Sequence, residues 1–483
     1  MKILDHVTRR KLLRGAAVGT VALASGAENI FGQREPAPPN IVFIMADDLG
    51  YADASCYGRP DLSTPNIDGL AAQGTRFLQA YANSAVCSAT RTALITGRYQ
   101  YRLPIGLEEP LAGRDVGLPP GHPTLPSLLK KAGYQTTLVG KWHLGLLPKF
   151  GPLQSGYDHF YGFRGGAVDY YRHGSNSRDD LWDDDVEVHQ MGYLTDMLGS
   201  RAVDVVNGSA KSGRPFLLSL HFNAPHWPWE APGDQAESER LRSGRGLIDF
   251  DGGTQQTYRR MIQEMDLQIG RVLEALNANG LAPNTIVIFT SDNGGERFAD
   301  TWPFTGRKTE LLEGGLRIPA IISWPARIPR GRTTDQVAIS MDWMPTLLAA
   351  AGVSPDPAFP PDGINLLPVL TGNSATVERK LFWRYKANAQ RAARDGDYKY
   401  LKILDNTFLF QVVDDPMERA NLKERRKDVY DRIVAGWHAW NRTMLPEDDA
   451  SSTDNFTGDE LADHIGTQRT SGKADNPVPP KPR

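Results

Sequence analysis

The chain alternates between short apolar runs and longer segments whose apolar residues recur at helical spacing. The runs are mainly apolar without strict alternation, which is typical of strands buried on both faces. They comprise Asn40–Met45, Thr136–Val139, Phe216–Phe222, Thr285–Thr290 and Ala320–Ser323. Helices are predicted between them at Thr64–Gly74, Leu125–Ala132, Thr195–Val206, Thr257–Asn279 and Asp342–Gly352. This alternation predicts an α/β fold.

The pattern changes after about Thr371. Strand-like pieces at Leu381–Tyr385, Tyr398–Ile403 and Phe408–Val412 alternate with turns and predict a small antiparallel sheet, with a helix at about Arg425–Trp440. We therefore divide the chain into a catalytic domain at 36–371, a C-terminal α+β subdomain at 372–445 and a disordered tail at 446–483. The acid-rich stretch Tyr170–His189 predicts a solvated insertion loop.

Polar residues follow several of the predicted strands at the point where each strand ends. They are Asp47 and Asp48, Lys141 and His143, His226, and Asp292 and Asn293. Singly, an aspartate pair favours a turn cap, a lysine a solvated loop tip, and a histidine a loop residue with satisfied hydrogen bonds. In open α/β sheets, however, ligand sites lie at the carboxyl ends of the strands. Several such ends converging on one sheet edge predict an active site.

The stretch Cys87–Arg98, CSATRTALITGR, supplies a candidate nucleophile. Its apolar residues Ala93 to Ile95 favour a helix ending at Gly97, which puts Cys87 at or just before the helix N-terminus. Unpaired N–H groups there favour an anion, and Arg91 follows one turn later on the same face. The alternative is a buried structural cysteine that opens an ordinary helix.

Composition sets limits on these interpretations. The 483 residues suffice for one large or two medium domains, and 47 glycines with 34 prolines predict long loops around a regular core. The net charge of -3 does not indicate a nucleic-acid-binding or membrane-surface protein. No apolar segment is long enough to predict a membrane span. A bound anion would have to be held by local charges.

Residues 1–27 read as an export signal. Thr8-Arg9-Arg10-Lys11-Leu12-Leu13 resembles the twin-arginine motif of bacterial export signals, and a weakly apolar run follows it. We therefore predict an exported protein, periplasmic or secreted. In such a protein, Cys56 and Cys87 would ordinarily form a disulfide. If Cys87 is instead the precursor of a nucleophile, Cys56 is a free thiol.

Two motifs carry a family resemblance. Cys-x-Ala-x-Arg followed by Thr-Gly-Arg in the Cys87 stretch resembles the first signature of the formylglycine-dependent (type I, arylsulfatase-like) sulfatases, with Ala89 where proline is commoner. Gly133–Gly145, GYQTTLVGKWHLG, resembles the second signature. Further similar segments surround His226, Lys308 and Glu313–Pro319, and the resemblance spans roughly Asn40 to Leu422.

The resemblance implies a fold and a substrate class. The fold is that of the alkaline-phosphatase-like superfamily, a large mixed β-sheet sandwiched between helices with a smaller C-terminal antiparallel-sheet subdomain. The activity is hydrolysis of a sulfated carbohydrate or an aryl sulfate ester, releasing inorganic sulfate. Two alternatives stay open: a phosphomonoester or phosphonate hydrolase of the same superfamily, and a non-catalytic binder of sulfated glycans.

The resemblance also implies residue roles. Cys87 would be oxidised to formylglycine (3-oxoalanine) by a formylglycine-generating enzyme or an anaerobic maturase, and its hydrate would attack sulfur. A metal ion would be held by Asp47, Asp48, the modified Cys87, Asp292 and Asn293. Because carboxylate and amide oxygens are hard ligands, calcium is expected, or magnesium with a tighter shell. Lys141, Lys308 and Arg91 would neutralise the sulfuryl oxygens, with His226 as general acid and His143 as the base that expels sulfate.

Overall fold

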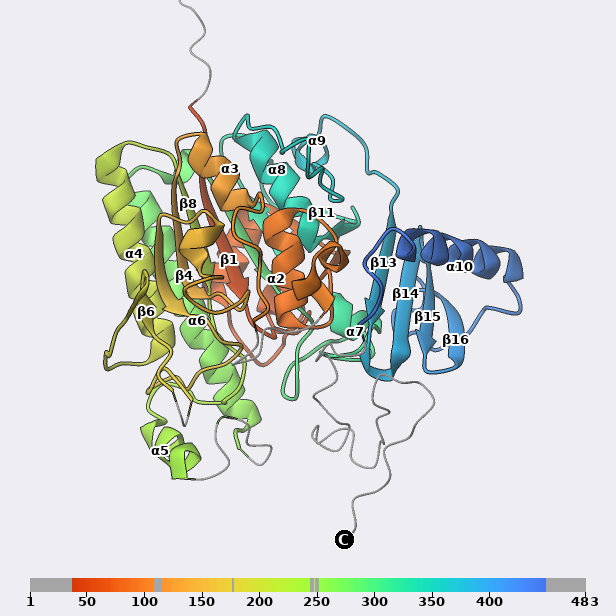
Figure 1. The fold of residues 1–483 in the computed structure, drawn as a ribbon, viewed down its shortest axis with the longest axis horizontal. Coiled ribbons are helices and arrows are strands. Elements are labelled where there is room, and N and C mark those ends of the chain that lie inside the picture. Colours follow the sequence, from red (N-terminus) through yellow and green to blue (C-terminus); the bar gives the residue numbers. More distant parts are fainter. Residues whose placement is uncertain (1–36, 108–114, 176–177, 244–246, 248–251, 449–483) are drawn as a thin grey trace, which may run out of the picture. The chain divides into compact units, whose positions relative to one another are not determined.

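The computed structural model describes residues 37–107, 115–175, 178–243, 247 and 252–448 (Figure 1). The predicted export signal at 1–27 lies outside these residues. So does most of the predicted tail, from residue 449 onward. Within the described part of the chain, no helix combines the length and apolar character needed to cross a membrane.

A ten-stranded sheet forms the centre of the molecule. Its four central strands are parallel neighbours in the order β9 (Thr285–Ser291), β1 (Asn40–Ala46), β8 (Phe216–His221) and β4 (Gln135–Lys141). Strand β10 (Ala320–Ser323) pairs antiparallel with β9, so the sheet is mixed, as predicted. The outer strands are β2 (Thr75–Phe77), β11 (Arg332–Thr334), β5 (His159–Phe163), β6 (Trp182–Asp183) and β7 (Val186–Glu187).

Helices cover both faces of this sheet (Figure 1). On one side lie α1 (Pro65–Gln73), α4 (Leu194–Ser212) and α6 (Gln255–Ala278), which pack with Val42 and Ile44 of β1. On the other lie α2 (Cys87–Thr96), α3 (Leu125–Lys131) and α8 (Trp343–Ala350), which pack with Ile41, Phe43 and Met45. Successive side chains of a strand point to opposite faces, so a strand between two helical layers is apolar throughout. The predicted sandwich is confirmed.

A separate four-stranded antiparallel sheet follows near the C-terminus. Its strands are β13 (Lys380–Tyr385), β14 (Gln390–Asp395), β15 (Tyr398–Ile403) and β16 (Asn406–Gln411), and α10 (Lys427–Asn441) contacts β14 and β15. The sequence predicted three of these strands. It missed β14 because QRAARD has neither an apolar run nor a regular alternation.

Shorter elements complete the fold. They are the helices α5 (Gln235–Ser243), α7 (Glu313–Leu316) and α9 (Leu367–Leu370), and the paired strands β3 (Ala80–Tyr81) and β12 (Ala338–Ile339). Single 3-10 turns lie at Ser55–Tyr57, Gln100–Arg102, Pro104–Leu107, Pro152–Ser155, Ala282–Asn284, Ser340–Asp342 and Ala387–Ala389. The predicted strand Thr136–Val139 is too short, because β4 extends to Lys141, which is its last residue and does not follow it.

Candidate active site

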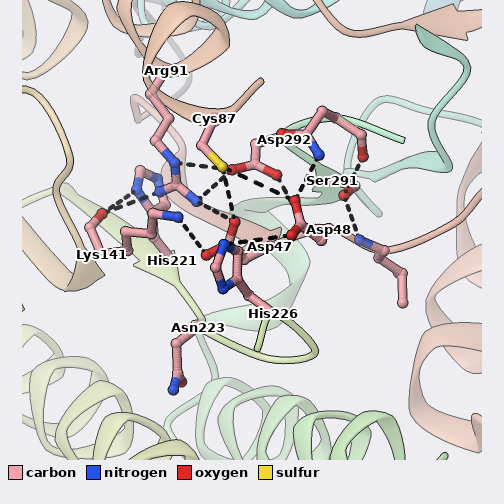
Figure 2. Close-up of polar contacts among 12 residues, drawn as sticks. Asp47, Asp48, Cys87, Arg91, Lys141, His221, Asn223, His226, Ser291 and Asp292 are labelled. Atoms are coloured by element: carbon pink, nitrogen blue, oxygen red, sulfur yellow. Dashed lines mark hydrogen bonds and ion pairs between the residues drawn. The ribbon is translucent and has the colours of Figure 1, made fainter. Parts of the chain in front are cut away.

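The polar residues predicted at the strand ends come together beside the start of α2 (Figure 2). Asp47 and Asp48 follow β1, Asp292 and Asn293 follow β9, and Lys141 closes β4. Two hydrogen bonds hold the first two of these ends together, since Asp48 N–H donates to the side-chain Oδ1 of Asp292 at 3.2 Å and Asp292 N–H donates to the Ala46 carbonyl at 3.3 Å. Parallel pairing of adjacent strands thus converts distant sequence positions into one cluster.

Cys87 is the first residue of α2, as predicted, and it is buried, with 2% of its surface exposed. Its Sγ lies 3.5 Å from Asp47 Oδ1 and 4.0 Å from Asp48 Oδ1. Burial raises the pKa of the Cys87 thiol well above its ordinary value, although Lys141 and Lys308 oppose the shift. The unmodified side chain is therefore a neutral thiol and a weak nucleophile. Cys56 and Cys87 both carry free thiols in the described chain, so the disulfide alternative is excluded.

Arg91 lies one helical turn after Cys87 and points into the same cluster (Figure 2). Its Nε and Nη2 donate to Asp292 Oδ2 at 3.1 and 2.8 Å, and its Nη1 donates to the Lys141 carbonyl at 3.2 Å. Burial alone would raise the pKa of Asp292, but Arg91 and Lys141 outweigh it and lower that pKa. The guanidinium therefore keeps Asp292 ionised and links β9 to β4.

Two buried lysines pair with the two aspartates that follow β1. Lys141 Nζ lies 2.6 Å from Asp47 Oδ2, and Lys308 Nζ lies 2.7 Å from Asp48 Oδ2. Burial alone would lower the pKa of Lys308, but Asp48 and Cys87 outweigh it and raise that pKa well above its ordinary value. Both lysines thus present ammonium groups inside the cluster.

His226 lies in the loop after β8, and both of its ring nitrogens have contacts. Nδ1 lies 2.6 Å from the Trp227 carbonyl, so this nitrogen carries the hydrogen. Nε2 lies 3.2 Å from Lys308 Nζ and 3.5 Å from Asp48 Oδ2. Burial, and then Lys308, lower the pKa of His226 well below its ordinary value. The imidazole is therefore neutral, with its Nε2 lone pair facing the cluster.

His143 is buried near the cluster but does not hydrogen-bond to it. Its Nδ1 has no hydrogen-bond partner among the described residues. A Cβ at Gly166 would lie 2.9 Å from the His143 ring, so the glycine leaves room for the imidazole. Burial, and then Lys141, lower the pKa of His143 well below its ordinary value. A neutral imidazole with an open nitrogen is suited to accept a proton.

The cluster offers oxygen ligands for a metal ion. Ligand atoms of Asp47, Asp48, Cys87 and His226 lie within 4.8 Å of one another. Of the other predicted ligands, Asp292 accepts from the Asp48 backbone, and Asn293 Nδ2 donates to Asp48 Oδ1 at 2.7 Å. Asn293 Oδ1 is buried with no hydrogen-bond partner in the described chain. An orphaned buried carbonyl oxygen is costly without a ligand, so these residues fit a hard cation.

Formal charge supports the same conclusion. Three carboxylates (Asp47, Asp48 and Asp292) face three cations (Arg91, Lys141 and Lys308) in the cluster. Burial raises the pKa of Asp47, although Lys141 opposes the shift. With all six groups ionised the formal charges sum to zero, so a divalent ion would add net positive charge. A positive, buried site favours binding of an anionic ester.

Sequence reasoning missed two buried residues that support the cluster. His221, the last residue of β8, places Nδ1 3.3 Å from the Lys141 carbonyl, and burial, then Arg91, lower its pKa to about 3. Tyr170 donates from its hydroxyl to the carbonyls of Asn223 and His226, at 3.0 and 2.9 Å. The strand-end position of His221 was a usable signal. The stretch containing Tyr170 was predicted to be solvated, which is wrong for this residue, whose exposed fraction is 0%.

The fold and the site together define a hydrolase of anionic esters. The chain also matches the family model "Sulfatase" over residues 39–353, and the model "N-sulphoglucosamine sulphohydrolase, C-terminal" over residues 306–438. The first match covers well over half of the chain, and the chain belongs to the sulfatase family, the hydrolases of sulfate esters.

Named relatives agree with this assignment. The chain is 32% identical to N-acetylgalactosamine-6-sulfatase of Canis lupus familiaris over 412 residues, covering 80% of this chain and 76% of that protein. It is 32% identical to arylsulfatase A of Homo sapiens over 400 residues, covering 75% of this chain and 74% of that one. The crystal structure of Ps i-CgsB in complex with k-i-k-neocarrahexaose matches with a TM-score of 0.78 and 30% identity, covering 86% of this chain and 95% of that chain.

Proposed function

We propose that this sulfatase releases inorganic sulfate from a sulfated carbohydrate, or from an aryl sulfate, through a formylglycine formed from Cys87. The observation that carries the proposal is the placement of Cys87 Sγ 3.5 Å from Asp47, inside a buried cluster that contains Arg91, Lys141 and Lys308. One similar protein bears the name N-acetylgalactosamine-6-sulfatase, and a similar solved structure is a complex with k-i-k-neocarrahexaose, and both support a carbohydrate substrate.

The neutral thiol argues for modification of Cys87. An unmodified thiol whose pKa is raised by burial is a poor nucleophile at neutral pH. A formylglycine at this position, installed by a formylglycine-generating enzyme or an anaerobic maturase, would supply an oxygen nucleophile instead. The helix start and the neighbouring cations favour negative charge on the attacking and sulfuryl oxygens.

The charged residues of the cluster bind and orient the ester. Lys141 and Lys308 present ammonium groups, and Arg91 presents a guanidinium held by Asp292. These cations neutralise the sulfuryl oxygens as charge develops on them. Asp47, Asp48, Asp292 and Asn293 would hold a calcium or magnesium ion, which supplies further positive charge when bound.

His226 and His143 transfer protons in the proposed reaction. His226 is neutral, and an anionic ester beside it would raise its pKa, so that proton uptake accompanies substrate binding. Protonated His226 then donates from Nε2 to the departing alcohol oxygen. His143, neutral and with Nδ1 open, serves as the base in the later step that releases sulfate.

We also propose that the protein is exported before it acts. Support comes from the arginine pair and the following apolar run within residues 1–27. A twin-arginine-type signal exports folded protein, so modification of Cys87 would be completed in the cytosol.

The test compares sulfate, phosphate and phosphonate esters of the same aryl alcohol, followed by a panel of sulfated oligosaccharides. We expect release of sulfate, with phosphate and phosphonate released far more slowly. Faster hydrolysis of the phosphorus esters would contradict the proposal in favour of a phosphomonoester or phosphonate hydrolase. Binding of sulfated glycan without hydrolysis of any ester would contradict it in favour of a non-catalytic binder.

A further inference from the structure

The C-terminal sheet reaches the active-site loops through one buried amide. Gln390, the first residue of β14, has an exposed fraction of 1%. Its Oε1 accepts a hydrogen bond from Leu311 N–H at 2.8 Å, and its Nε2 donates to the Thr309 carbonyl at 2.9 Å. Both partners lie in the segment that follows Lys308. The amide of Gln390 therefore makes two hydrogen bonds to the turn that follows Lys308, one as acceptor and one as donor.

The turn that Gln390 holds also contacts the nucleophile segment. Thr309 N–H donates to the Ala85 carbonyl at 2.9 Å, two residues before Cys87, and Lys308 N–H donates to the Gly295 carbonyl at 3.0 Å. Thr309 has φ 74°, a left-handed conformation that is unfavourable for a β-branched residue. Such a conformation persists only where neighbouring contacts enforce it. The Gln390 amide supplies two of those contacts.

Gln390 is itself fixed within its own sheet. Its Nε2 also donates to the Ala387 carbonyl at 3.1 Å, in the connection between β13 and β14. In this connection, Asn388 and Ala389 have φ 56° and 47°, and Leu404 N–H donates to the Asn388 carbonyl at 2.7 Å. The amide is thus anchored at the edge of a rigid sheet, which is the requirement for holding another loop in place.

A second contact between the C-terminal sheet and the catalytic domain consists of buried ion pairs. Lys399 of β15, with an exposed fraction of 0%, lies 3.0 Å from Glu313 and 2.9 Å from Glu418. Removing any of these groups leaves unpaired buried charge and disturbs folding as a whole. Gln390 is neutral, so removing its contacts leaves no unpaired buried charge, and the cost is limited to the unsatisfied Leu311 N–H and Thr309 carbonyl.

We propose that Gln390 is a positioning residue for Lys308, so that the C-terminal sheet completes the sulfate-binding cluster. The inference rests on the proposed role of Lys308 as a ligand of the sulfuryl group. Lys308 Nζ touches both Asp48 and His226, at 2.7 and 3.2 Å. Without the Gln390 contacts, the turn after Lys308 would shift, and the Lys308 ammonium would move away from the sulfuryl oxygens and from His226. Small misplacements of this kind reduce rate steeply.

The test is a double-mutant cycle on the matured, full-length enzyme with an aryl sulfate. Gln390→Met removes both hydrogen bonds to the turn, and methionine has a side-chain volume similar to that of glutamine. We expect kcat to fall on the order of ten- to a hundredfold in the wild-type background. In the Lys308→Ala background the same substitution should have almost no further effect, because the side chain that it positions is gone. Gln411→Met is the matched control, since this glutamine of β16 also accepts from backbone N–H groups, at Val413 and Asp414, and should leave kcat unchanged in both backgrounds.

Equal losses from Gln390→Met in both backgrounds would overturn the inference, because a general structural defect does not depend on Lys308. An unchanged kcat in the wild-type background would overturn it as well. If Gln390→Met does not fold, Gln390→Asn decides in the same cycle, since its neutral amide is one methylene shorter and is withdrawn from both Thr309 and Leu311. Wild-type enzyme that releases no sulfate would instead contradict the proposed function, so the two failures are distinguishable.

Discussion

The ammonium of Lys308 lies 3.2 Å from Nε2 of His226. The contact places a permanent positive charge beside a histidine whose other nitrogen already donates to a carbonyl. His226 therefore stays neutral until negative charge enters the site. In the proposed mechanism, the bound ester would raise the pKa of His226, and the protonated imidazole would then donate to the leaving group.

The first prediction concerns Cys87. In active protein, the peptide that contains Cys87 should carry an aldehyde in place of the thiol, because the buried thiol is neutral. Mass spectrometry of the digested enzyme measures this directly. Cys87→Ala should abolish turnover, whereas Cys56→Ala, at the second free thiol, should retain it. Fully active enzyme that contains only unmodified cysteine at this position would refute the proposed nucleophile.

The second prediction concerns the metal ion. Dialysis against a chelator should remove activity, and calcium or magnesium should restore it, because the ligands are oxygens. Asp47→Asn and Asp292→Asn keep side-chain shape but remove charge. Each should lower bound metal and reduce kcat on the order of a hundredfold or more. Metal content by atomic emission, measured beside activity, is the readout. Asp431→Asn, on the surface of α10, is the control. Full activity in metal-free enzyme would contradict the site.

The third prediction concerns His226 as general acid. Protonation matters most for a basic leaving group, so His226→Ala should slow hydrolysis of a sugar sulfate on the order of a hundredfold or more. A nitrophenyl sulfate, whose alcohol departs without help, should be affected far less. His159→Ala, at a largely exposed histidine, should change neither rate. Equal losses on the two substrates would mean that His226 does not protonate the leaving group.

The fourth prediction concerns His143, the proposed base of the later step. His143→Ala should slow both substrates to a similar extent, because sulfate release does not depend on the alcohol. In rapid-mixing experiments, release of the alcohol should run ahead of release of sulfate. Simultaneous release of the two products in this variant, with the lag found in His226→Ala instead, would show that the two roles are exchanged.

The fifth prediction concerns Glu230, which lies beyond the His226 loop and accepts from Tyr170 N–H at 2.8 Å. Burial, and then Asp169, raise its pKa from 4.5 to about 9. Between these values the folded state holds a proton that the unfolded state has released. The free energy of unfolding should therefore fall as pH rises through this window, by up to ~1.4 kcal/mol per pH unit.

Thermal denaturation at several pH values tests this prediction. Glu230→Gln keeps an acceptor for Tyr170 but cannot ionise, so its melting temperature should decline less between pH 5 and 9 than that of the wild type. Glu274→Gln, at an exposed position of α6, should follow the wild type. Parallel curves for the wild type and Glu230→Gln would show that Glu230 does not set this dependence.

Local patterns in the sequence predicted much of the fold. Continuous apolar runs such as Asn40–Met45 predicted buried strands, and the helix at Cys87 followed from its apolar residues and the glycine at its end. These features are readable because strand burial and helix capping depend on neighbouring residues. Strand β14 could not be predicted from the sequence, since its residues show no strand-like pattern and are stabilised by pairing with β13 and β15.

The sequence by itself thus determined which residue types were available for the site: a cysteine at a helix start, carboxylates at strand ends, and cations on that helix, at a strand end and in a turn. Tertiary structure alone decided which of them meet. The pairing of Lys308 with His226, the orphaned Asn293 Oδ1, the His221 contact with the Lys141 carbonyl and the hold of Gln390 on the Lys308 turn join positions far apart in the chain. Such contacts depend on sheet order and loop packing, which no local pattern of side chains encodes.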